Sequence, residues 1–265
     1  MKYEKIFLLI TFSLSYFISI VFLSEEFIGA LLFISMIPAF AAIISNLIES
    51  ASIKVLLKPF VYKVSFKSLM FAVFYPLIII FLCASSAILI KCGVLSQDLY
   101  YASINIFKLI LISIVFFVVG LLEEYGWRGY LLPRLINRYN LRTANLIMGL
   151  ILILYNLPAI IILNLHYNKR KFILYILLQT IAIWVINYAF THLFTLSANV
   201  ILPSIMHTLW NNVNIAVLGD TYRNASNGLI LGRTLLINGQ CLFGVIFLSI
   251  FAVYAHRRLL KISSA

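Results

Sequence analysis

The chain has 265 residues, of which 63% are hydrophobic and only 11% are charged. A soluble domain usually carries about 25% charged residues, so this composition excludes an ordinary water-soluble protein and indicates a protein of the lipid bilayer. The formal net charge is +12, from 20 Lys and Arg residues against 8 Asp and Glu residues. A basic excess can indicate nucleic-acid binding. Here the basic residues lie between apolar runs and form no stripe, so we expect lipid contact and cytoplasmic loops, and no nucleic-acid partner.

Apolar runs long enough to cross a bilayer follow one another along the whole chain. A membrane helix needs about 20 mostly apolar residues. The first run is longer than the apolar core of a usual signal peptide and lacks a small-residue cleavage pattern, so we interpret it as a retained span. The sequence predicts an all-α, polytopic membrane protein with eight transmembrane helices, at residues 6–23, 28–48, 68–90, 104–122, 143–163, 172–191, 198–218 and 238–256.

The distribution of Lys and Arg predicts how these spans are oriented, because cytoplasmic loops are enriched in basic residues. If the N-terminus is inside, the inner side holds Lys2, Lys5, Lys54, Lys58, Lys63, Lys67, Arg128, Arg134, Arg138, Arg142, Arg257, Arg258 and Lys261. The outer side then holds Lys91, Lys169, Arg170, Lys171, Arg223 and Arg233. The cluster at 169–171 opposes this assignment, but the larger number favours it. We therefore expect a multi-pass protein of the cell membrane with both termini in the cytoplasm.

Two adjacent carboxylates differ from the other acidic residues in their position. Glu123 and Glu124 directly follow the apolar run FFVVGLL (residues 116–122), so they lie at the end of a span or inside it. Ionisable groups at membrane depth are costly and usually functional. In a continuous helix Glu124 lies four residues before Arg128 and can pair with it, whereas Glu123 points about 100° away. Desolvation and the neighbouring like charge then favour the neutral form of Glu123, which suits a general base that activates water. The alternative is an ion pair at the membrane interface.

A second polar pair lies in the seventh predicted span. His207 and Asn211 are four residues apart, so they share one face of a helix. Two hydrogen-bond donors on one face can form an oxyanion hole; the alternative is a buried His–Asn pair that joins two helices. The remaining histidines, His166, His192 and His256, lie in a loop or at helix ends, and we interpret them as surface or interface residues.

Two segments of the chain resemble signatures of one known family. The segment EEYGWRGYLLPRL (residues 123–135) resembles the first signature, E-E-x-x-x-R, of the CAAX-protease and bacteriocin-processing family, also called the Abi or type II CAAX prenyl endopeptidase family. The segment ANVILPSIMHTLWN (residues 198–211) resembles its last signature, H-x-x-x-N. The order and separation also fit, and the resemblance covers roughly residues 110–215. It divides the chain into N-terminal transmembrane helices (1–103), catalytic core helices (104–218), and a C-terminal helix with a basic tail (219–265).

The resemblance implies a membrane-embedded endopeptidase that needs no metal or other cofactor, with its cavity between the fourth, fifth and seventh spans. It implies that Glu123 is the base that activates water, and that Glu124 with Arg128 shapes the site. It also implies that His207 and Asn211 form the oxyanion hole. The expected substrate is a peptide, such as a C-terminal prenylated one or a bacteriocin leader.

The middle signature of the family, F-x-x-x-H before Leu-Pro, is altered in this chain. The matching stretch LILYNLP (residues 152–158) has Asn156 where the family has His. An Asn side chain can orient water by hydrogen bonding but cannot take up a proton near neutral pH. One His and one Glu also make a poor catalytic zinc site, which usually has three protein ligands. The alternatives are therefore an impaired family member that acts as a bacteriocin-immunity or binding protein, and a small transporter, which the scarcity of charges in the other spans disfavours.

Overall fold

The computed structural model describes residues 2–23, 29–50, 52–62, 64–97 and 113–263, which are almost entirely helical. The predicted all-α membrane fold is therefore confirmed. Its helices are α1 (Lys2–Ile18), which continues as a π-helical turn η1 (Ser19–Leu23), α2 (Ala30–Ser50), α3 (Ile53–Leu57), η2 (Lys58–Phe60), α4 (Phe66–Leu89), a helix over 113–124 that continues as η3 (Tyr125–Leu131), α6 (Leu132–Arg138), α7 (Leu141–Tyr167), α8 (Phe172–Ser197), α9 (Ile201–Leu218), α10 (Thr234–Ile237) and α11 (Leu242–Ser263). Two short strands, β1 (Gly93–Leu95) and β2 (Ile230–Gly232), pair antiparallel.

Six helical segments are long and apolar enough to cross a bilayer, and each overlaps a predicted span. They are Lys2–Leu23, Ala30–Ser50, Phe66–Leu89, Leu141–Tyr167, Phe172–Ser197 and Thr234–Arg258. The predicted span 104–122 lies partly outside the described residues. The predicted span 198–218 corresponds to α9, whose His, Asn, Ser and Thr side chains lower its hydropathy. Six spans are thus supported by length and composition, and the total of eight stays a prediction.

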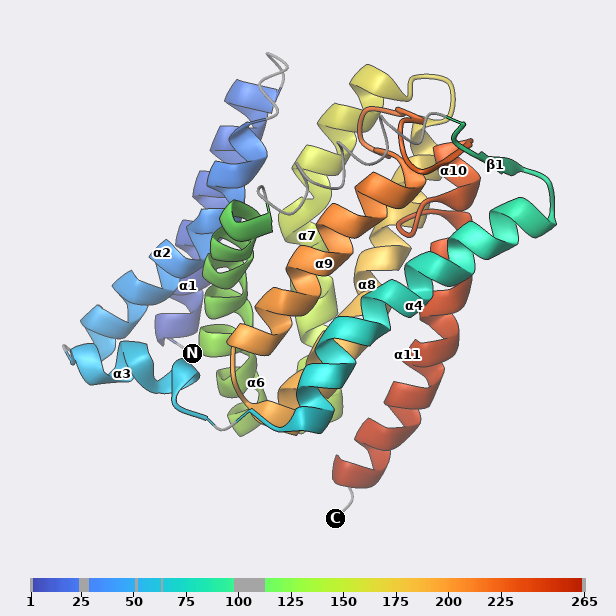
Figure 1. Cartoon of the computed structure of the whole chain (residues 1–265). Coiled ribbons are helices and arrows are strands. Elements are labelled where there is room, and N and C mark those ends of the chain that lie inside the picture. Colours follow the sequence, from blue (N-terminus) through green and yellow to red (C-terminus); the bar gives the residue numbers. More distant parts are fainter. Residues whose placement is uncertain (1, 24–28, 51, 63, 98–112, 264–265) are drawn as a thin grey trace.

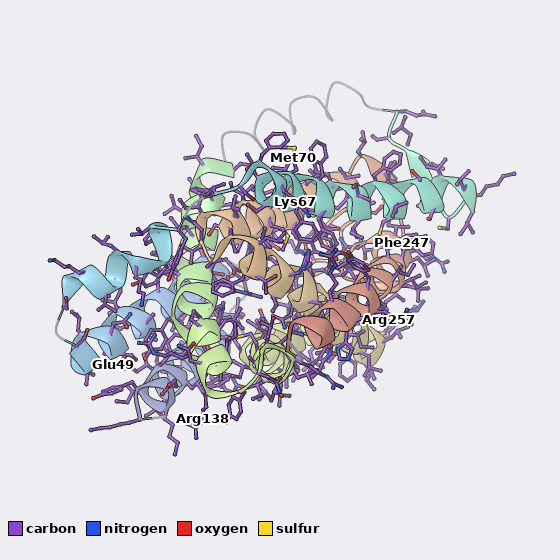
Figure 2. All side chains as sticks on the ribbon, turned by 90° about the horizontal axis from the view of Figure 1, so that it is seen from below. Glu49, Lys67, Met70, Arg138, Phe247 and Arg257 are labelled. Atoms are coloured by element: carbon purple, nitrogen blue, oxygen red, sulfur yellow. The ribbon has the colours of Figure 1, made fainter. Side chains whose placement is uncertain are left out.

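Both chain termini lie at the same end of the helical bundle, and the two short strands lie at the other (Figure 1). We call these ends the terminal face and the loop face. Figure 2 views the bundle from the terminal face and labels Lys67 of α4, Arg138 of α6 and Arg257 of α11. All three belong to the basic residues that the sequence assigns to one side of the membrane. Which side of the membrane this face contacts stays a prediction.

Two hydrophobic clusters hold the bundle together. One is built from α1, α2, η3 and α7, and the other mainly from α4, α8, α9 and α11. In the first cluster the buried Trp127 ring packs edge-on against Phe7 and Tyr155, with ring centroids 5.6 and 5.0 Å apart. Lipid tails are as apolar as these side chains, so close packing and hydrogen bonds between helices stabilise such a bundle more than apolar burial does.

Helix α2 touches the segment that carries the acidic pair without intervening side chains. A Cβ atom added at Gly126 would lie 2.4 Å from the carbonyl carbon of Pro38, so the two backbones are in direct contact. Pro38 has no N–H and leaves the carbonyl of Ile34 without its helical partner. The Tyr155 hydroxyl of α7 donates to that carbonyl at 2.7 Å. This bond joins α2 to α7 beside the position of Asn156.

Candidate active site

The acidic pair lies where the helix over 113–124 widens into the π-helical turn η3. The N–H of Leu132 donates to the carbonyl of Trp127, five residues earlier. A π turn holds one residue more than an α turn and is frequent at functional sites. Glu123 and Glu124 are both buried, at 8% and 1% exposure. Such burial of adjacent carboxylates requires partners that balance their charge.

Arg128 is the direct charge partner of Glu124, as their spacing predicts. Its Nη1 lies 3.1 Å from each carboxylate oxygen of Glu124, and the guanidinium is 3% exposed. Its Nη2 donates to the Oδ1 of Asn187 at 3.0 Å, and the guanidinium lies over the Phe190 ring at 4.5 Å from the centroid. The amide of Asn187 in turn donates to Asn145 of α7. An anion, an amide and an aromatic ring from two helices therefore fix Arg128.

His207 of α9 lies between the two carboxylates. Its Nδ1 is 2.9 Å from Glu124 Oε1, and its Nε2 is 3.8 Å from Glu123 Oε2. The carboxylate accepts, so Nδ1 carries a hydrogen, and Nε2 is left facing Glu123. With both carboxylates ionised and Arg128 charged, the four groups sum to zero only when the imidazole is protonated. A cluster with no net charge therefore carries one proton on either His207 or Glu123, and we call it the shared proton.

All six residues that the sequence predicts for the site line one cavity of about 480 Å³. The cavity lies at the predicted place, against the helix over 113–124, α7 and α9, and α2 and α8 complete its wall. Its apolar lining includes Leu31, Ile34, Phe116, Val119 and Ile183. Toward the loop face it continues to Asp220, Tyr222, Arg223 and Gln240. Such a mainly apolar cavity with a few polar groups is typical of a ligand-binding or active site.

Asn156 and Asn211 line the cavity without contacting the carboxylates directly. The Asn156 side chain donates from Nδ2 to the carbonyl of Leu152 at 2.9 Å, within α7. Asn211 is half-buried, and its side chain makes no hydrogen bond within the described ranges. Its amide therefore remains available to a ligand in the cavity.

Three features of the site have no counterpart in the sequence analysis. The contact between His207 and Glu124 joins residues 83 positions apart, and no local pattern indicates it. The sequence analysis also does not include Asn187, although an amide within the apolar run of α8 is a usable signal, because unpaired polar groups are costly in a membrane. Tyr222 was missed because it lies in a loop with no motif. Among the described residues, no group of three His, Cys, Asp or Glu side chains is placed to hold a metal ion.

Comparison with known families matches a segment that contributes much of the cavity lining. Residues 105–213 match the family model described as type II CAAX prenyl endopeptidase Rce1-like. The matched segment includes the acidic pair, Asn156 and the His207–Asn211 pair, and it agrees with the resemblance seen in the two signatures. A comparison with curated proteins gives no match. Residues 105–213 thus resemble an Rce1-like type II CAAX prenyl endopeptidase domain, which supports the family resemblance of the two signatures.

Proposed function

We propose that the protein is a membrane-embedded endopeptidase of the CAAX-processing type, in which Glu123 activates the water that attacks the peptide bond. The observation that carries this proposal is the gap of 3.8 Å between Glu123 Oε2 and His207 Nε2 inside the cavity. The gap is too long for a direct hydrogen bond. A water molecule can contact both atoms at about 2.8 Å, which is an ordinary hydrogen-bond distance.

The shared proton assigns a role to each charged group. When the proton is on His207, Glu123 is ionised and can accept a proton from water, as a general base does. In the same state His207 Nε2 carries a hydrogen and can donate to the oxyanion that forms on the substrate, together with the amide of Asn211. The proton on Glu123 then passes to the leaving amine. Glu124, held by Arg128, keeps the imidazole in this orientation.

The presence of Asn156 leads us to expect slow turnover, and it also favours a second candidate function. General acid–base assistance is typically worth about 10² to 10⁴ in rate, and Asn156 cannot supply the part that a His would. If the loss is complete, the same cavity could still bind a peptide, and the protein would act as a binding or bacteriocin-immunity protein. We favour the endopeptidase because Glu123, Glu124, Arg128 and His207 remain in one connected cluster.

The substrate that we propose is a peptide or a prenylated protein presented at the cell membrane. The mainly apolar cavity lining accepts apolar peptide side chains or a lipid-modified residue. We place both termini in the cytoplasm because the predicted inner side carries more Lys and Arg than the predicted outer side.

The test is cleavage of a peptide library by the purified protein in lipid nanodiscs, with the products read by mass spectrometry. We expect slow cleavage by the native chain, none by Glu123→Gln, and faster cleavage by Asn156→His, because a second imidazole would then line the cavity. Asn156→Ala is the control for the loss of the amide. If Asn156→His gains nothing and cleavage stays absent, the binding-protein function is the better assignment. If the native chain cleaves quickly and Asn156→Ala is harmless, Asn156 takes no part in the reaction.

A further inference from the structure

The cavity extends well beyond the charged cluster toward the loop face. Eleven residues of α9 separate His207 from the helix end at Leu218, and at 1.5 Å per residue they span about 17 Å. Past this end, Tyr222 and Gln240 still line the same cavity. An extended peptide rises about 3.3 Å per residue. The cavity is therefore long enough for about five extended residues on one side of the charged cluster.

A tight turn holds Tyr222 at the far end of this cavity. The backbones of Asp220 and Ala225 exchange two hydrogen bonds of 2.9 Å, which closes the turn. The N–H of Tyr222 donates to the side chain of Asp220 at 2.9 Å. The carbonyl of Thr221 accepts from the Asn168 side chain of α7 at 3.2 Å. These bonds place the Tyr222 backbone before any ligand arrives.

Polar groups at this end of the cavity are not used within the described parts of the chain. The Tyr222 hydroxyl makes no hydrogen bond there, and the side-chain oxygen of Gln240 is buried without a partner. Asn211, nearer the charged cluster, is likewise unused. Burial raises the pKa of Tyr222, and the charges of Asp220 and Glu123 raise it further. The hydroxyl therefore stays protonated and remains a hydrogen-bond donor at neutral pH. Buried polar groups in proteins almost always have partners, so the unpaired oxygen of Gln240 fits a polar ligand. The half-buried Tyr222 lines the same cavity, and its hydroxyl can donate to that ligand.

We propose that Tyr222 and Gln240 bind the backbone of an extended peptide, as a subsite that leads to the charged cluster. Every peptide unit except proline offers one carbonyl acceptor and one N–H donor. The Tyr222 hydroxyl donates to a carbonyl of the peptide, and the Gln240 amide pairs with a neighbouring unit. The apolar walls contact the side chains without selecting them strongly. The inference rests on the proposed function, because it treats the cavity as a peptide site.

The test measures binding apart from cleavage. Fluorescein-labelled peptides of two to nine residues are titrated against the protein in nanodiscs and followed by anisotropy. We expect affinity to rise with length up to about five or six residues and then to level off. Tyr222→Phe should weaken the longer peptides about 3- to 10-fold, the value of one hydrogen bond, and leave dipeptides unchanged. The control is Tyr254→Phe on α11, whose ring is 49% exposed and does not line the cavity.

A second series uses the native chain alone and so does not depend on whether a variant folds. Peptides with one backbone N–H methylated are compared with their parents. A loss at one or two positions supports backbone recognition, and equal affinity at every position overturns it. Tyr222→Phe that binds all lengths like the native chain also overturns the proposal. Binding with the expected dependence on peptide length but without cleavage supports the subsite and contradicts the endopeptidase function. Cleavage that is independent of Tyr222 supports the endopeptidase function and contradicts the subsite.

Discussion

Glu124→Gln tests whether the buried ion pair, rather than the carboxylate pair as a whole, stabilises the site. Glu124 and Arg128 are 1% and 3% exposed, so neither can exchange its partner for bulk water. The amide keeps the shape of the carboxylate but removes its charge, and Arg128 retains only the bond to Asn187 and its contact with Phe190. Removing one partner of a buried pair costs about 3–5 kcal/mol. At about 2–4 °C per kcal/mol, the Tm should fall by roughly 6–20 °C.

Glu123→Gln is the matched control, because the two residues are adjacent and both are buried. The charged group facing Glu123 is His207 at 3.8 Å, beyond a direct hydrogen bond. We therefore expect a loss within about 1 kcal/mol. Thermal unfolding of both variants in one detergent, followed by tryptophan fluorescence, gives the comparison. Equal Tm losses would refute the division of roles. Adding Arg128→Gln to Glu124→Gln should recover part of the loss, because the double variant leaves no buried charge unpaired.

Three further predictions follow from the packing, the charge distribution and the loop. Gly126→Ala should lower the free energy of unfolding by about 1–3 kcal/mol, measured as a Tm shift, because the new Cβ would lie 2.4 Å from the Pro38 backbone. In a cysteine-free background, Lys67→Cys and Ser226→Cys should react with a membrane-impermeant maleimide from opposite sides of the membrane; labelling from one side contradicts the arrangement. Burial raises the pKa of Tyr222 in the folded protein. The stability that its protonated hydroxyl contributes is therefore full below the ordinary tyrosine pKa of about 10 and is lost as the pH rises above that value. Tyr222→Phe should therefore lose less Tm than the native chain between about pH 9 and pH 11.

The sequence predicts most of the fold because the bilayer imposes a length and a composition on each span. Hydropathy is least informative for α9, since the side chains that line the cavity are the ones that make the helix less apolar. Local spacing also predicts the pairing of Glu124 with Arg128, which depends only on one helical turn. It cannot predict that the carbonyl of Leu154, freed by Pro158, accepts from the Tyr16 hydroxyl at 2.8 Å. That bond depends on how α1 and α7 pack.

The contact between His207 and Glu124 is likewise not predictable from local sequence. It also changes the expected effect of Asn156 on catalysis. The family resemblance implies a His in the middle signature, and this chain has Asn156 there, so one imidazole that could transfer protons is missing. The structure places a different imidazole, that of His207, with its Nε2 at 3.8 Å from Glu123 Oε2.

The shared proton then limits the rate that this arrangement can reach. His207 can donate to an oxyanion from Nε2 only when it is protonated, and Glu123 can accept a proton only when it is ionised. One proton shared between them satisfies both conditions when it lies on His207. Raising the pH removes this proton from His207, and lowering the pH protonates Glu123, so each change abolishes one of the two conditions. Turnover by the native chain should therefore follow a bell-shaped pH profile, as expected for a coupled acid and base. A profile that rises to a plateau would show that Glu123 works without His207.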